Sequence, residues 1–127
     1  MNLLEWCVHY AKARDAIEQK LKSMDEKPDR IVCHYKDKEV TFLPMEKLAT
    51  DLPAGLVTIV CVQNQQNFDT LVENFSEYSK NPGLTIIFLN PKLDEKWLIK
   101  PAIHAAVADK ASLKTGLLTL YQMVPEV

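Results

Sequence analysis

Residues 56–89 read LVTIVCVQNQQNFDTLVENFSEYSKNPGLTIIFL, and this stretch decides the fold. It begins and ends with continuous apolar runs, Leu56–Val62 and Leu84–Leu89, which are rich in β-branched residues. Such runs are typical of strands that are covered on both faces. Between them, the apolar residues of 67–79 recur at helical spacing, and Asn67 is expected to cap the helix. A strand, a helix and a strand in this order predict a parallel βαβ unit.

The segment before this unit predicts a helix followed by a β-hairpin. Apolar residues recur at steps of three or four over 2–24, which predicts an amphipathic helix that ends before Pro28. Residues 31–43 alternate on both sides of the polar turn KDKE, as the two strands of a hairpin do, and Pro44 stops the return strand. One or two helical turns are expected over 45–52.

The segment after the unit contains KWLIKPAIHAAVADK, residues 96–110, which has two interpretations. It is either a single helix broken at Pro101, or a short strand over 97–99 followed by a helix over 101–109, and we favour the second. In that helix Ile103, Ala106 and Val107 are expected to face the core. A last helix, capped by Ser112, is expected to reach about residue 123, although 117–124 also fits an edge strand.

Taken together, the elements predict one α/β domain over residues 1–127. Its sheet is mixed, with about four to five strands that combine the antiparallel hairpin with the parallel βαβ pair, and with helices on both faces. A chain of 127 residues is too short for two domains that each bury a good core.

Cysteine usage and charge narrow the function classes. Cys7, Cys33 and Cys61 are far apart and odd in number, which argues against a disulfide framework and favours a reducing compartment. No close Cys or His pair suits a metal, and the three glycines form no phosphate-binding loop, so neither metal nor cofactor is expected. The net charge of −2 disfavours nucleic-acid binding through the one weakly basic group, which consists of Lys96, Lys100, His104, Lys110 and Lys114.

The location expected from the sequence is the cytoplasm. The first fifteen residues are charged throughout and lack the basic start of a secretory signal, so we expect no signal peptide. No apolar run approaches the roughly 18 residues that a membrane helix needs, so no membrane contact is expected.

Polar residues after the two buried strands form the candidate ligand site. Parallel strands deliver the loops that follow them to one edge of the sheet, where ligands bind in folds of this kind. If the 101–109 helix starts at that edge, its first turn adds a lysine and a histidine; which edge it starts from stays open. A small anion is the ligand expected there. The candidate residues are Gln63, Asn64, Asn67, Asn90, Lys100 and His104.

Two functions follow as hypotheses. The first is a non-enzymatic protein that acts through protein contacts, including self-association as a homodimer, because no catalytic constellation is recognisable. The second is a small-molecule or anion-binding protein, a class that includes enzymes, that uses the strand-end edge. A concave pocket favours the second function, and a flat exposed apolar patch favours the first.

Overall fold

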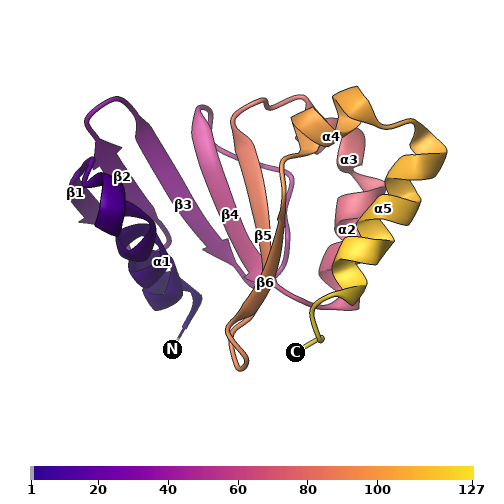
Figure 1. Cartoon of the computed structure of the whole chain (residues 1–127), viewed down its shortest axis with the longest axis horizontal. Helices are drawn as coiled ribbons and strands as arrows, with labels where there is room; N and C mark the ends of the chain where they lie inside the picture. The colour runs from indigo at the N-terminus through magenta and orange to yellow at the C-terminus, as the bar shows by residue number, and fades with distance from the viewer. Residues whose placement is uncertain (1) are drawn as a thin grey trace.

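The computed structural model describes residues 2–127 as a six-stranded mixed sheet with helices on both faces (Figure 1). The strands lie in the sheet in the order in which they occur along the chain, from β1 to β6. In chain order the elements are α1 (Leu3–Glu18), β1 (Leu21–Glu26), β2 (Ile31–Tyr35), β3 (Glu39–Met45), β4 (Leu56–Val62), α2 (Gln65–Glu73), α3 (Phe75–Ser79), β5 (Leu84–Asn90), β6 (Glu95–Ile99), α4 (Pro101–Val107) and α5 (Lys110–Gln122).

The predicted βαβ unit is confirmed at the centre of the sheet. Strands β4 and β5 pair in parallel from Val57 opposite Leu84 to Val62 opposite Leu89, and α2 and α3 connect them. The β2–β3 hairpin is also confirmed, and β3 joins the unit by pairing in parallel with β4. Pro44 does not stop the return strand as expected, because β3 continues through it to Met45. Strand β6 pairs antiparallel with β5. It is the last strand in the sheet and therefore an edge strand.

Two apolar clusters hold the helices against the sheet. On one face α1 contacts β2, β3 and β4 through a cluster that includes Cys7, Cys33 and Val60. On the other face α2, α3 and α5 cover a larger cluster around Ile59 and Ile86. Figure 1 shows α1 lying toward the β1–β3 end of the sheet. The α1 face of β5 and β6 is therefore only partly covered by a helix.

The helix predicted over 2–24 is wrong beyond residue 18. Gln19 takes a left-handed conformation with φ of 53°, and one Asp15 carboxylate oxygen accepts from the backbone N–H groups of Lys20 and Leu21. These contacts turn the chain into β1. Because a bulge between Leu21 and Ser23 adds one residue, Leu21 and Met24 both pack on the core side, and their three-residue spacing resembles that of a helix.

Three smaller predictions need correction. Residues 46–52 form an irregular loop and not helical turns. The backbone N–H of the buried Leu48 donates to the Asn67 side chain of α2 and not to a carbonyl within the loop. Helix α2 is capped by Asn64 and not by Asn67, because the amide oxygen of Asn64 accepts from the Asn67 N–H. Helix α5 is capped by Asp109 and not by Ser112, because the Asp109 carboxylate accepts from the Ser112 N–H. Residues 117–122 are helical, which excludes the edge strand.

The helix α4 also differs from the prediction in what it buries. It ends at Val107, and Pro101 is its buried residue, whereas Ile103 and Val107 are exposed. The reason is its position: α4 contacts α3 and β5 near the end of the sheet and does not lie across a sheet face.

The three cysteines are free and buried, and we expect them to be unreactive in the folded protein. Burial raises the pKa of Cys7 to about 12 and that of Cys33 to about 11, and it also raises the pKa of Cys61. Near pH 8 a thiol reagent such as DTNB should therefore label them only after unfolding. Fast labelling of the native chain would contradict this burial.

The same shifts set the direction of the pH dependence of stability. A thiol whose pKa is raised by folding contributes stability that is fully present below its unfolded pKa of about 8.5. That contribution is lost as the pH rises toward the folded values. We therefore expect the free energy of unfolding to fall above about pH 8.5, and replacing Cys61 by alanine should reduce this slope.

Candidate functional site

The polar residues that follow β4 and β5 serve the fold itself. Gln63 is fully buried, and its amide nitrogen donates to the backbone oxygens of Tyr121 and Val124 at 2.8 and 2.9 Å. Its amide oxygen accepts from the Trp97 indole at 2.8 Å. The N–H of Val127 binds the Gln63 carbonyl oxygen at 3.0 Å. This side chain therefore connects β4, β6 and the segment after α5.

The asparagines of the same edge are used in a similar way. Asn67 is buried; its amide nitrogen donates to the Glu46 and Val62 carbonyls, and its oxygen accepts from Leu48 N–H. Asn90 donates to the carbonyl of Pro125. Within residues 2–127 every buried side-chain nitrogen and oxygen has a hydrogen-bond partner. The predicted cluster of Gln63, Asn64, Asn67 and Asn90 does come together, but its amide groups bind the protein's own backbone and the Trp97 indole.

Lys100 and His104 lie at the opposite end of the sheet from that cluster. Strand β6 runs antiparallel to β5, so its last residue, Ile99, pairs with Ile86 near the start of β5. The structure therefore does not bring Lys100 and His104 to Asn90. Ligand binding at any of these residues stays a prediction.

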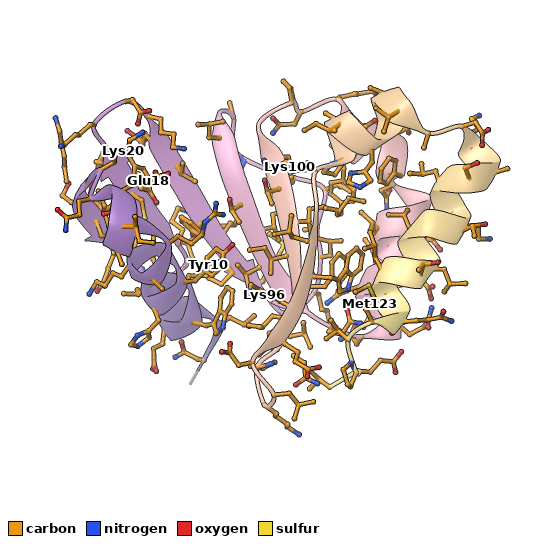
Figure 2. The ribbon with its side chains drawn as sticks, in the orientation of Figure 1. Tyr10, Glu18, Lys20, Lys96, Lys100 and Met123 are labelled. Atoms are coloured by element: carbon orange, nitrogen blue, oxygen red, sulfur yellow. The ribbon has the colours of Figure 1, made fainter. Side chains whose placement is uncertain are left out.

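A groove lies instead between α1 and β6, on the incompletely covered face of the sheet (Figure 2). It has a volume of about 480 Å³ and is open to solvent. Its walls come from α1, from the turn between β2 and β3, and from β6 with the start of α4. In Figure 2, Tyr10 and Glu18 lie on the α1 side and Lys100 lies on the β6 side.

Two threonines lie side by side in the floor of this groove. Thr58 of β4 pairs with Thr85 of β5, and both side chains line the groove. Their neighbours in each strand, Val57, Ile59 and Ile86 among them, point to the opposite face and belong to the larger core cluster. The apolar part of the lining includes Val40, Phe42, Leu56, Ile87, Leu98 and Ile103.

Charged side chains surround this floor. Arg14 and Lys100 come from opposite walls, and Lys20 and Lys38 add two more cations. No side chain that lines the groove belongs to an ion pair within residues 2–127. Of the three acidic residues, Asp15 already accepts two backbone N–H groups. The lining thus carries four cations against three carboxylates, a net charge of +1 that slightly favours an anion.

Tyrosine hydroxyls complete the polar lining. The Tyr10 hydroxyl accepts a hydrogen bond from Arg14 at 3.2 Å, which holds the guanidinium over the groove wall. Burial, with smaller effects of Cys33 and Asp15, raises the pKa of Tyr35 to about 12. The Tyr35 hydroxyl thus keeps its proton at neutral pH and can donate to a ligand.

At one end of the groove, side chains of α1 contact β6 and the turn before it. The Trp6 indole donates to the Asp94 carboxylate at 2.9 Å, which links α1 to the turn before β6. Trp6 stacks on Tyr10, with ring centroids 4.7 Å apart, and the Lys96 ammonium lies 5.5 Å from the Tyr10 ring. These contacts connect α1 with β6 although the two elements lie on different parts of the sheet.

Sequence reasoning missed the groove, although a signal for it was present. Each of the two apolar strands contains a single threonine, Thr58 in LVTIVCV and Thr85 in LTIIFL. Burial would favour an apolar residue at both positions, so two threonines in register indicate an opening on that face. The cations of α1 carried no comparable signal, because charged residues on the outer face of a helix are ordinary.

Comparison with protein-family models, with curated proteins and with solved structures finds no match to this chain. None of the helices in residues 2–127 is both long and apolar enough to cross a membrane. In the same residues no three His, Cys, Asp or Glu side chains are grouped closely enough to hold a metal ion. The groove itself therefore supplies the argument for function.

Proposed function

We propose that this protein binds a small organic anion with an apolar body in the groove between α1 and β6. The observation that carries the proposal is the pair of in-register threonines, Thr58 and Thr85, in a groove of about 480 Å³. Cations from both walls, Arg14 and Lys100, belong to no ion pair within the described chain. A volume of this size is typical of small-molecule sites.

Each part of the groove has a role in this proposal. The guanidinium of Arg14 and the ammonium of Lys100 would form charge-assisted hydrogen bonds with a carboxylate or phosphate. The threonine hydroxyls and Tyr35 would donate to the same group or to a neighbouring oxygen. Apolar side chains such as Phe42 and Leu98 would cover the body of the ligand. The proposal is one of binding and assigns no chemical step.

The test is an NMR titration of the full chain with straight-chain carboxylates from acetate to octanoate and with inorganic phosphate. Affinity should rise with chain length, because each methylene removed from water contributes up to about 0.8 kcal/mol. Amide shifts should appear around Thr58, Thr85 and Lys100. Replacing Arg14 or Lys100 by alanine should weaken octanoate binding about fivefold, since these exposed charges are partly screened.

Lys12→Ala is the matched control, because Lys12 is an exposed cation of the same helix that does not line the groove. It should leave the octanoate affinity unchanged. Shifts confined to residues 63–67 and Asn90 would instead support the strand-end site. The absence of shifts at both places, or an equal loss of affinity in Lys12→Ala and Arg14→Ala, would reject the groove.

A second proposed function is contact with another protein chain, including self-association. The observation that favours it is an uncovered sheet edge, β6, next to the exposed apolar side chains Leu98 and Met123. We also propose the cytoplasm as the location of the protein. The support for this location is that Cys7, Cys33 and Cys61 are free and buried, which suits a reducing compartment.

A further inference from the structure

The backbone of β6 leaves hydrogen-bonding groups free at the edge of the sheet. The backbone carbonyls of Gly83 and Leu89 accept from the N–H groups of Val57 and Gln63. The backbone groups of the odd-numbered residues of β5 therefore point toward β4, and those of the even-numbered residues point toward β6. Their partners in β6, which are Glu95, Trp97 and Ile99, point back toward β5. The N–H and C=O groups of the two residues between them, Lys96 and Leu98, therefore point away from the sheet.

Apolar surface lies on both sides of these free groups. Leu98, which is 39% exposed, lies on the α1 face of the sheet. On the other face, a hollow of about 570 Å³ runs along β6 beside Leu120, Met123 and Val124 of the α5 segment. Met123 is 70% exposed. A strand added to β6 would cover apolar surface on both faces as well as pair the backbone.

The opposite edge of the sheet is protected from such pairing. Strand β1 has the sequence LKSMDE, which exposes charged side chains along most of its length. It also contains a bulge between Leu21 and Ser23. Charges and bulges are the devices by which natural sheets prevent edge pairing. Strand β6 also exposes charges, at Glu95 and Lys96, but it has no bulge in its pairing with β5 and is therefore the more regular edge for a strand to join.

We infer that the strand that pairs with β6 is β6 of a second copy, in antiparallel orientation with Trp97 opposite Trp97 on the twofold axis. This inference rests on the second proposed function above and not on the groove. Two edge strands can pair only if the residues whose backbone groups point outward lie opposite each other. This register places Lys96 opposite Leu98 of the second copy, and each of these residues donates its N–H to the C=O of the other. The twofold axis repeats this pair, which gives four backbone hydrogen bonds.

Charge selects this register over its neighbours. With Trp97 at the axis, Lys100 of the second copy comes next to the turn that carries Asp94, whose φ of 51° ends the extended strand, and the symmetry repeats this contact. A shift of two residues in either sense would place Lys96 opposite Lys100 or bring the Asp94 turn beside Leu98. The Asp94 side chain is already held on the α1 face by Trp6, the same face on which Lys100 lines the groove. The opposite charges thus meet on one face of the joined sheet.

The twofold axis stands perpendicular to the sheet, so the two copies present the same face to the same side. Their α1 faces, and hence their two grooves, would adjoin across β6. On the other face the two α5 helices would flank the axis and cover Met123. Self-association through β6 therefore explains in one arrangement the free backbone groups, the exposed methionine and the placement of Asp94 and Lys100.

The first test is the solution mass of the full chain, measured by light scattering. We expect twice the mass of one chain for the natural sequence and a monomer for Leu98→Pro. Because the Leu98 N–H points outward, proline there removes no bond within the monomer, and its far-UV circular dichroism should match that of the natural chain. A natural chain that is monomeric, or a folded Leu98→Pro that is still dimeric, overturns the inference.

The second test reads the register and does not depend on how proline is tolerated. Lys96→Cys and Leu98→Cys chains are mixed and oxidised. Opposed residues in a hydrogen-bonded antiparallel pair have Cα atoms roughly 5.5 Å apart, which suits a disulfide. The mixture should form a covalent dimer of the two different chains, whereas each variant alone should form little. Equal cross-linking in all three samples overturns the register. Octanoate binding by a monomeric chain would leave the groove proposal intact.

Discussion

Replacing Gln63 with leucine is expected to lower the free energy of unfolding by about 2–6 kcal/mol. Leucine has a similar volume, so the loss comes from hydrogen bonding and not from a cavity. The backbone carbonyl of Val124 and the indole N–H of Trp97 would be left without their buried partner, whereas the Tyr121 carbonyl would keep its bond from the Val124 N–H. Each unsatisfied buried group costs about 1–3 kcal/mol. Chemical denaturation of the two proteins measures the difference.

The matched control is Gln66→Leu, which makes the same chemical change at an exposed position of α2. It should change stability by no more than about 0.5 kcal/mol. Trp97→Phe removes the indole donor together with part of the buried ring, and the double variant should cost less than the sum of the two single changes, because both remove the same hydrogen bond. If Gln63→Leu were as stable as the natural chain, the network around this residue would not exist as described.

Ile86→Ala is expected to destabilise the protein by about 2–5 kcal/mol, and Ile86→Val by about 0.5–1.5 kcal/mol. Ile86 is fully buried in the larger cluster, between β4 and β6. Removing its methyl and methylene groups loses transfer free energy and leaves a cavity, since both neighbouring strands hold the backbone in place. The denaturation midpoint should fall at an unchanged slope.

Leu118→Ala serves as the comparison, because Leu118 is partly exposed on α5. Its cost should stay well below that of Ile86→Ala. A graded series in which alanine, valine and isoleucine at position 86 differ by less than the experimental error would place this residue outside a packed core.

The central part of the fold was predictable because each strand there is a continuous apolar run. Burial on both faces selects hydrophobic residues at most positions of β4 and β5, and the pattern shows it directly; Thr58 and Thr85, which face the groove, are the exceptions. The end of α1 was not predictable from spacing, because the bulge in β1 gives Leu21 and Met24 the spacing of a helix. Only the tertiary position of these two side chains distinguishes the two structures.

The candidate site was less accessible to the sequence. Gln63, Asn67 and Asn90 were identified as an amide cluster, and they do lie at one edge, yet their partners are carbonyls that no local pattern reveals. The position of Lys100 depended on the direction of β6, which a strand of five residues does not encode locally. The groove needed the register of β4 and β5, which brings Thr58 and Thr85 together.

The sequential order of the strands has a consequence for how the sheet assembles. Every strand pairs with the strand that precedes it in the chain, so no step requires distant segments to meet first. Short loops cost little entropy to close, and contacts that are local in sequence favour fast folding. The first and last strands along the chain are also the two edges of the sheet. A protease or a pulling force that acts from either end would therefore peel one edge strand at a time, and would reach β3–β5 last.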